Sequence, residues 1–396
     1  MRIIEKTTLR LVFSLGLALT VSFASSFFMP AVLARPMADS LGCSISTVYA
    51  AFSLALIVAA VTVPFAGKYV DAYGGKRVLA ASNIWFALSL VLLSRAQNEV
   101  GLFLGWASLG IAMGAGLYDI AFATIVRSRG SAAPPAIAGI ALLAGFSSTV
   151  SWPVSHYILT HFGWQQVLLA WAGAHLFLAL PLNLSLVLPM QPRDMKSSGE
   201  EPRPDATSSG RAEKSKLPAM LALALAFAFT GFCTGAIVGH LPGLLQLFGV
   251  SVAASILAGM AFGPAQVVAR LLLLAVQHKF LPVNAGILAA LIVSLGAVAL
   301  VLFGPGVAVL VTIVIGFGNG MMTTIKGTMP LSIFGEKGYG HRQGLLFLPW
   351  GISMALAPFL FSLCVDALDK GALYVFIAAA WLAALLFLCL KRLAHR

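Results

Sequence analysis

Long runs of apolar residues, separated by short polar stretches, recur along almost the whole chain. They lie at about 9–34, 46–67, 78–94, 101–124, 135–159 and 165–189, and again at about 218–241, 251–275, 284–303, 307–326, 344–365 and 372–390. Each run is long enough for a helix to cross the ~30 Å hydrocarbon core of a bilayer. Lipid cannot satisfy the hydrogen bonds of a loose backbone, so helices are the spanning element. The pattern predicts an all-α membrane protein with twelve transmembrane helices.

A polar stretch divides these helices into two groups of six. Residues 191–217 are rich in Pro, Ser, Gly and charge, a composition typical of a disordered linker. We therefore expect an N-terminal six-helix bundle over 1–190, a cytoplasmic linker over 191–217 and a C-terminal six-helix bundle over 218–396.

The two halves also resemble each other in sequence. GAGLYD at 114–119 matches GNGMMT at 318–323, and Pro153 and Pro358 fall at corresponding points of helices 5 and 11. A duplicated six-helix unit is typical of secondary transporters, in which substrate binds between the repeats near the membrane midplane. The repeat predicts two pseudo-symmetric bundles with a central binding site.

The composition agrees with a membrane protein. Hydrophobic residues make up 60% of the chain and charged residues 10%, whereas soluble proteins contain roughly 25% charged residues. The formal charge of +12 would suggest nucleic acid as the partner of a soluble protein. Here basic loops at an anionic membrane face explain it, and we expect no nucleic-acid partner.

The basic residues predict the orientation. Of the 25 lysines and arginines, Arg35, Arg95 and Lys370 fall outside, Arg270 and Lys326 fall in or at the edge of the membrane, and the others fall on one side. Positive loops stay in the cytoplasm, so we expect a multi-pass protein of the inner (plasma) membrane with both termini cytoplasmic.

The loop between helices 2 and 3, PFAGKYVDAYGGKRVL, carries a recognisable motif. It resembles the conserved loop of the major facilitator superfamily, in which Gly, Asp, Gly and a basic pair follow at fixed spacing. The matching positions are Gly67, Asp71, Gly74, Lys76 and Arg77. Ala72 stands where the family usually has a basic residue, and Gly75 where the first basic residue often comes. The resemblance implies the major facilitator fold for the whole chain.

The resemblance also implies a gate. In the family the acidic residue of this loop locks the halves together on the cytoplasmic side in the outward-facing state. Asp71 is then expected to meet the start of helix 11 and one of the basic residues Arg77, Arg127 and Arg129. The alternative is a solvated basic hairpin that only fixes the topology.

Within the superfamily, the first half is most similar to the monocarboxylate and oxalate–formate porters. The likeness rests on SISTVYAAFSLALIVAAVTVPFAGKYVD, on AIAGIALLAGFSSTVSWPV and on the FGW that starts helix 6. In those porters an arginine of helix 8 contacts the substrate carboxylate, and Arg270 falls at the matching place. A guanidinium binds a carboxylate through two parallel hydrogen bonds. The alternative is a structural pair with an internal acid or with helix carbonyls.

Other polar residues inside the spans are candidates for the same site. Asp119 is the one acid well inside a span, and we expect it to be either the coupling proton carrier or the counter-ion of Arg270 or Lys326. Gln266 occupies the position where proton-coupled porters have an aspartate. Lys326 is expected either to contact the substrate or to extend its side chain to the membrane interface. Tyr118 is expected either to line the cavity or only to pack against its neighbours.

Together these features favour a secondary active carrier of a small organic anion that works by alternating access with protons or a counter-substrate. The alternatives are an exporter of drugs, metalloids or other toxic compounds and, more remotely, a transporter-like sensor. The sequence has no catalytic triad, phosphate-binding loop or metal cluster, so we expect neither an enzyme nor a cofactor. The expected partners are the small-molecule substrate, its coupling ion and the lipid bilayer, and the protein is expected to be a monomer.

Overall fold

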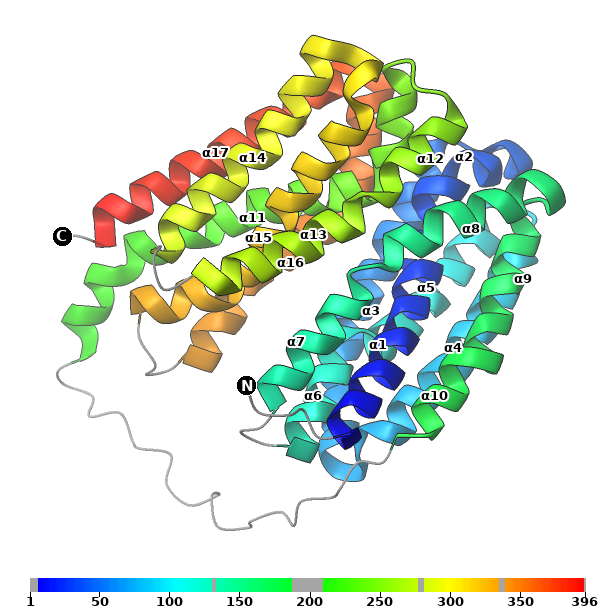
Figure 1. Ribbon diagram of the computed structural model, residues 1–396, viewed down its shortest axis with the longest axis horizontal. Helices are drawn as coiled ribbons and strands as arrows, with labels where there is room; N and C mark the ends of the chain where they lie inside the picture. Colours follow the sequence, from blue (N-terminus) through cyan, green and yellow to red (C-terminus); the bar gives the residue numbers. More distant parts are fainter. Residues whose placement is uncertain (1–5, 130–132, 187–208, 277–280, 335–338, 395–396) are drawn as a thin grey trace.

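The computed structural model describes residues 6–129, 133–186, 209–276, 281–334 and 339–394. The described residues form helices joined by short turns, and the helices assemble into two bundles (Figure 1).

The N-terminal bundle contains the first six spans. Its helices are α1 (Lys6–Ser26), α2 (Pro30–Leu41), α3 (Ile45–Tyr73), α4 (Gly75–Ser94), α5 (Glu99–Gly116), α6 (Tyr118–Arg129), α7 (Ala133–Ala144), α8 (Ser147–Phe162), α9 (Trp164–Ala174), a π-helical turn (His175–Ala179) and α10 (Leu180–Leu184). The pairs α1–α2, α5–α6 and α7–α8 and the α9–α10 run each make one span with a local break.

The C-terminal bundle contains the other six. Its helices are α11 (Ser209–Leu247), α12 (Val252–Met260), α13 (Phe262–Val276), α14 (Pro282–Phe303), α15 (Ala308–Phe334), α16 (Tyr339–Leu368) and α17 (Ala372–Ala394), with short 3-10 turns at Gly304–Val307 and Asp369–Gly371. Here α12 and α13 together make one span with a local break.

These segments confirm the predicted twelve-helix membrane fold. Ten stretches of the described chain are long and apolar enough to span, and two of them, of 45 and 46 residues, each hold two spanning helices, α14 with α15 and α16 with α17. The helix boundaries differ most from the prediction in two places. Helix α15 continues past Lys326 to Phe334, and α11 begins at Ser209, inside the stretch expected to be linker.

Small residues allow the helices of each bundle to approach closely. A side-chain carbon added to Gly110 or Gly114 of α5 would lie 2.4 or 2.5 Å from backbone oxygens of α3. Small residues four apart are a common packing surface between membrane helices, where van der Waals contact replaces the hydrophobic effect. Backbone contact, rather than large side chains, thus sets the close approach of α3 and α5 at these positions.

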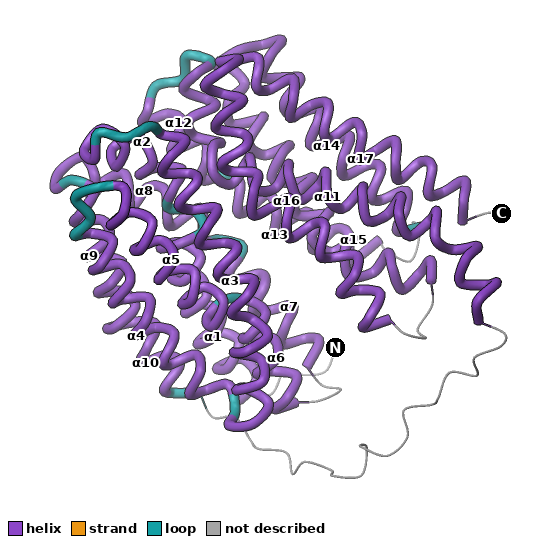
Figure 2. The backbone as a smooth tube through the Cα atoms, turned by 180° about the vertical axis from the view of Figure 1, so that it is seen from behind, coloured by secondary structure: helices purple, strands orange, loops and turns teal. Residues whose placement is uncertain are grey.

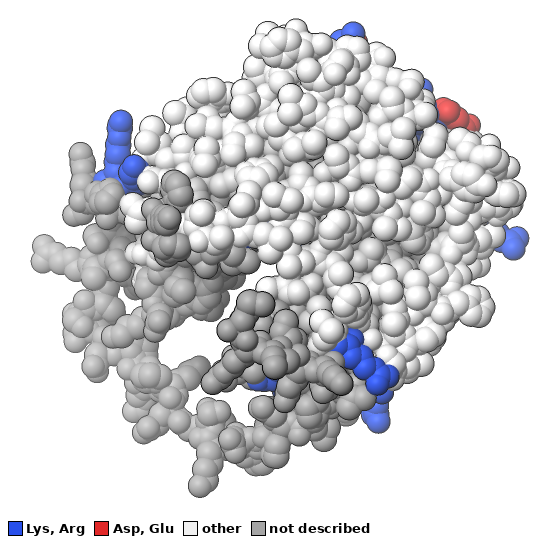
Figure 3. Space-filling model, in the orientation of Figure 1, with Lys and Arg blue, Asp and Glu red and all other residues white. Residues whose placement is uncertain are grey.

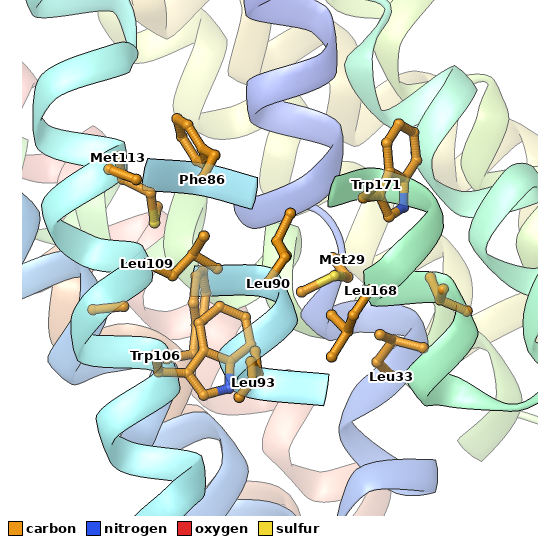
Figure 4. Packing of buried hydrophobic residues seen from close by; sticks show 14 of the residues in the cluster. Met29, Leu33, Phe86, Leu90, Leu93, Trp106, Leu109, Met113, Leu168 and Trp171 are labelled. Atoms are coloured by element: carbon orange, nitrogen blue, oxygen red, sulfur yellow. The ribbon is translucent and has the colours of Figure 1, made fainter. Parts of the chain in front are cut away.

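Large side chains fill the remaining space within the N-terminal bundle. Figure 4 shows Phe86, Leu90 and Leu93 of α4 facing Trp106 and neighbouring residues of α5, and these four named side chains have 0% exposure. The outer faces are apolar as well, and Figure 3 shows a largely uncharged surface with lysine and arginine at its edges. This surface is the one that lipid covers.

The two bundles meet at one end and separate at the other. Both termini lie at the end where the bundles diverge, which we call the open end (Figures 1 and 2). At the opposite, closed end lie the α2–α3 turn and the start of α12. Two buried clusters cross between bundles there, since Ala355 joins the N-terminal cluster and Phe28 and Trp152 join the C-terminal one.

Candidate functional site

Arg270 lies in the middle of α13 and reaches across to the other bundle. Its Nη1 donates a 3.1 Å hydrogen bond to the carbonyl oxygen of Ala141 on α7, and its Nη2 donates to Gln266 Oε1 at 3.1 Å. Nη2 also lies 3.5 Å from Thr323 Oγ1 on α15. All of these acceptors are uncharged. Among the described residues, no carboxylate forms an ion pair with Arg270, and its buried Nε has no hydrogen-bond partner.

Tyr118 lies beside Arg270, at the point where the fourth span breaks, and Asp119 follows it in the chain. Helix α5 ends at Gly116, Leu117 is extended, and α6 begins at Tyr118. Tyr118 Oη lies 3.5 Å from the same Ala141 carbonyl that Arg270 contacts. Asp119 occupies the first turn of α6, where the helix dipole favours a negative charge.

Asp119 is accessible to solvent although protein surrounds it on most sides. Lys326 of α15 lies within electrostatic range of Asp119 and also of Arg270. The Lys326 ammonium stands over the Trp350 ring of α16, 3.1 Å from its centre. That geometry is a cation–π contact, which is strongest where the cation is desolvated. Lys326 therefore points inward rather than out to the interface.

Charged groups from both bundles thus gather at one level of the molecule. Arg270 and Lys326 come from the C-terminal bundle and Asp119 from the N-terminal bundle. Two cations and one anion leave this cluster with a net positive charge when all three are ionised. Uncompensated charge inside a membrane is costly and usually marks a transport pathway.

Glycines hold the helix that carries Arg270 tightly on two sides. A side-chain carbon at Gly263 of α13 would lie 2.5 Å from the Gly145 carbonyl oxygen, between α7 and α8. On the other side, a carbon at Gly320 of α15 would lie 2.5 Å from the Gln266 carbonyl oxygen. These backbone contacts place the base of the Arg270 side chain with little freedom to shift.

The loop motif is partly accounted for by local structure. Gly74 has φ +87°, a conformation that favours glycine. Gly75 is required by packing, because an added carbon would lie 1.7 Å from Thr124 Oγ1 of α6. Gly67 has open space around it, with nothing within 4 Å of an added carbon.

The basic residues of the motif lie at the open end. Arg127 donates from Nη1 to the Val70 carbonyl near the C-terminus of α3, where a cation also meets the negative end of the helix dipole. Arg77 is exposed and Lys76 is partly buried in the first turn of α4. The side chains of Asp71 and of the first residues of α16, the predicted helix 11, lie outside what the structure describes, so the gate contact predicted for Asp71 stays a prediction.

Two histidines and a tryptophan inside the spans have structural partners. His175 is fully buried, with Nε2 2.8 Å from Ser25 Oγ and Nδ1 2.9 Å from Asn83 Oδ1. His240 lies 2.9 Å from the Pro358 carbonyl oxygen. Trp152 is fully buried and donates to the Phe28 carbonyl at 2.9 Å, so it packs the closed end rather than lining the cavity.

The sequence interpretation missed some of the site. It named Gln266 only as the absence of an acid, and it passed over Thr323 and Trp350. The carbonyl of Ala141 has no side-chain signal at all. The glycine contacts did leave a signal, since GMAFG at 259–263 and GFGNG at 316–320 both carry glycines four apart.

The chain belongs to the Major Facilitator Superfamily, whose family model matches residues 15–358. It is similar to the "Multidrug resistance protein MdtL" of Salmonella paratyphi C and of Salmonella choleraesuis, with 30% identity over 191 residues in each case. Those matches cover 46% of this chain and 47% of the relatives, so they span about half of each protein.

Solved structures share the fold. A bacterial homologue of the human lysosomal transporter Spinster, in an inward-facing and unoccupied conformation, matches with a TM-score of 0.76, 16% identity and 98% of both chains. The nucleoside transporter NupG matches with a TM-score of 0.73 and 15% identity over 98% of this chain and 99% of its own. The D-xylose–proton symporter matches with a TM-score of 0.74 and 15% identity over 96% of both chains.

The chain is therefore a multi-pass membrane protein of a superfamily of transporters, which is not a family of enzymes. Its place among the monocarboxylate and oxalate–formate porters stays a prediction.

Proposed function

We propose that this protein transports a small organic anion, a monocarboxylate or a similar compound, and that Arg270 binds the anionic group. The observation that carries the proposal is the set of partners around the guanidinium. Arg270 is held by uncharged acceptors from three helices and forms no ion pair among the described residues. Its positive charge is therefore not matched by a neighbouring carboxylate, and a bound anion would match it.

The geometry favours a carboxylate over a neutral ligand. A guanidinium offers five N–H donors in a fixed plane, and a carboxylate accepts two of them in parallel. The nearby ammonium of Lys326 adds a second positive charge within electrostatic range. Since like charges repel in a low-dielectric site, an anion between the two cations relieves the repulsion. Tyr118 adds a hydroxyl beside the same Ala141 carbonyl.

The anion would also reach both halves of the molecule. Arg270 contacts the N-terminal bundle through Ala141, so an anion that takes the guanidinium competes with a contact between bundles. This is the coupling that alternating access requires, because the substrate must alter the balance between conformations. We assign the open end to the cytoplasm from the basic residues there, which makes the structure inward-facing and both termini cytoplasmic.

Asp119 is the proposed coupling residue. It is ionisable, accessible to solvent, and close enough to Lys326 for its protonation to change the charge of the cluster. The gate at the cytoplasmic side would use the loop residues Gly67, Asp71, Gly74, Lys76, Arg77 and Arg127, as the family resemblance implies. The proposed site is the inner (plasma) membrane and the proposed functional unit is a monomer.

The test is uptake into proteoliposomes of a panel of labelled carboxylates, with and without an imposed pH gradient. We expect one or more small carboxylates to accumulate, and to accumulate further when the gradient drives proton entry. Matched neutral analogues, in which an amide replaces the carboxylate, should not be carried. Equal uptake of acids and amides would overturn the anion assignment.

A second candidate function is efflux of drugs or other toxic compounds. It is favoured by one observation, the 30% identity to multidrug resistance proteins over 191 residues. Cationic and neutral drugs belong in the same uptake panel for this reason. Transport of a cationic drug without any carboxylate transport would replace the leading proposal with this one.

Substitution of Asp119 by Asn separates its two possible roles. Asn mimics the protonated acid, so a proton carrier should lose gradient-driven accumulation but keep the exchange of labelled for unlabelled substrate. If Asp119 is instead a fixed counter-ion, the change leaves Lys326 less compensated, and protein yield, thermal stability and exchange should fall together. Unchanged accumulation in Asp119→Asn would contradict both roles.

A further inference from the structure

A groove lies on the surface of the N-terminal bundle, and Arg270, Asp119 and Lys326 of the central site are not among the residues that line it. It has a volume of about 640 Å³ and is lined by one face each of α3, α4 and α5. Phe65, Tyr69 and Tyr73 of α3 line one wall and are 62–65% exposed. Trp85 of α4 lines the other wall. A groove of this size is within the range of small-molecule sites, about 300–1,000 Å³.

The groove has a polar end and an apolar end. Arg77, exposed in the first turn of α4, lies at the open end of the molecule, and Trp85 lies eight residues deeper on the same helix. Those residues are ~12 Å apart at the rise of an α-helix. One leaflet contributes about 15 Å of the hydrocarbon core. The groove therefore extends from the headgroup level through most of one leaflet.

The chemistry at the polar end selects negative charge. Arg77 is accompanied by Lys68 and Lys76, which lie on either side of the turn between α3 and α4. A guanidinium binds phosphate oxygens through paired hydrogen bonds, and the exposed tyrosines add hydroxyl donors. Anionic lipids are enriched at the cytoplasmic leaflet, which basic clusters near the membrane attract.

We propose that this groove binds one anionic phospholipid of the cytoplasmic leaflet, with its phosphate on Arg77 and an acyl chain along Phe65, Tyr69 and Trp85. The leaflet assignment rests on the orientation given under the proposed function. The occupant binds outside the substrate pathway, so lipid binding and anion transport are separate properties of the molecule. Since the groove joins α3 to α4, a bound lipid would brace the turn that carries the loop motif.

Trp85 makes the site measurable. The protein is placed in nanodiscs of phosphatidylcholine with brominated acyl chains, which quench tryptophans that face lipid. A small mole fraction of unbrominated phosphatidylglycerol then replaces part of that lipid. Subtracting the signal of Trp85→Phe isolates Trp85, and Trp381→Phe isolates a control tryptophan that is 50% exposed on α17 and does not line the groove.

We expect Trp85 to recover far more fluorescence than the mole fraction of phosphatidylglycerol explains, while Trp381 follows the mole fraction. Arg77→Gln should reduce the preference for phosphatidylglycerol about tenfold, the size expected for losing one hydrogen bond to a charged group. Ala81→Phe, which fills the groove without changing charge, should remove the excess recovery. Lys391→Gln, a charge change at the end of α17, should leave it unchanged.

Other results would overturn the proposal. Equal recovery with unbrominated phosphatidylcholine would exclude a headgroup contact. Recovery produced by free glycerol phosphate would assign the site to soluble phosphate instead of lipid. A Trp85 signal that no lipid quenches would mean that a second protein copy covers the groove. None of these readouts involves transport, so they do not depend on the identity of the carried substrate.

Discussion

The closed and open ends of the molecule are built from the same spans but are held together differently. At the closed end, apolar clusters continue from one bundle into the other. At the open end each bundle has its own cluster, and the members of those clusters come from a single half. Opening the closed end would expose shared apolar core, whereas the open end is already separate. A conformational change that opens the closed end must therefore break these shared apolar contacts.

Hydrogen bonds follow the same division. Ser46 of α3 bonds to Ser362 Oγ at 2.8 Å and to the Asp366 carboxylate, both on α16 near the closed end. Tyr49 Oη donates to the Gly239 carbonyl at 2.7 Å, and Thr149 Oγ1 donates to the Met260 carbonyl at 2.9 Å. At the central site, the contact from Arg270 to the Ala141 carbonyl is a hydrogen bond between the two bundles. An anion that displaces it therefore acts at the inner limit of the closed region.

The largest expected effect comes from separating the bundles at the closed end. In Gly263→Val the new side chain would meet the Gly145 carbonyl oxygen, which lies 2.5 Å from its first carbon and cannot rotate away. Overpacking of this kind costs about 1–3 kcal/mol. We expect the closed end to loosen and Cys364, half-buried on α16, to react faster with maleimide in a variant that retains it as the single cysteine.

The matched control is Gly243→Val, because an added carbon at Gly243 meets nothing within 4 Å. Its labelling rate at Cys364 should equal that of the parent. Equal rates in Gly263→Val and Gly243→Val would show that the glycine crossing does not hold the closed end.

A smaller effect is expected at the open end, within one bundle. Gly75→Ala would bring a methyl carbon 1.7 Å from Thr124 Oγ1, so α4 or the Thr124 side chain must move. Gly67→Ala meets open space and should gain up to about 1 kcal/mol from helix propensity. Thermal unfolding in detergent should therefore show a lower Tm for Gly75→Ala and an unchanged or higher Tm for Gly67→Ala. The reverse order would contradict the packing role given to Gly75.

The smallest effect concerns a cysteine in the turn between α2 and α3. Burial, and then the negative charge of Glu99, raise the pKa of the Cys43 thiol. A raised pKa leaves less reactive thiolate at a given pH, so labelling should be slow at neutral pH and should accelerate only in more alkaline solution. In Glu99→Gln the pKa falls and labelling should become about twofold faster at the same pH, the size expected for an exposed charge pair. An unchanged pH–rate profile would show that the charge of Glu99 does not raise the pKa of the Cys43 thiol.

The apolar segments were sufficient to predict the spans, because a membrane helix must satisfy its backbone internally and so shows its full length in sequence. The breaks within spans were not predictable in this way. GAGLYD and GNGMMT are similar in sequence, yet the chain breaks at Leu117 in the first and continues as α15 through the second. The difference arises from what each helix packs against, which the local sequence does not contain.

The central site was predictable in part for a related reason. Arg270, Asp119 and Lys326 could be named because a charge inside an apolar span is conspicuous. Their partners could not, since the Ala141 carbonyl and the Trp350 ring are ordinary features of helices that the fold brings near. The same limit applies to Gly75, whose role depends on Thr124 in another span.

The most direct test of the central claim is equilibrium exchange of a labelled carboxylate across proteoliposomes containing Arg270→Lys, without a pH gradient. Lysine keeps the charge but loses the planar pair of donors. The matched control is Arg35→Lys, which makes the same change at an exposed residue of α2. We predict that Arg270→Lys folds normally and exchanges substrate at least about tenfold more slowly or with at least about tenfold weaker apparent affinity, whereas Arg35→Lys behaves as the parent. Exchange by Arg270→Lys at the parent rate and affinity would contradict the claim that this arginine binds the transported anion.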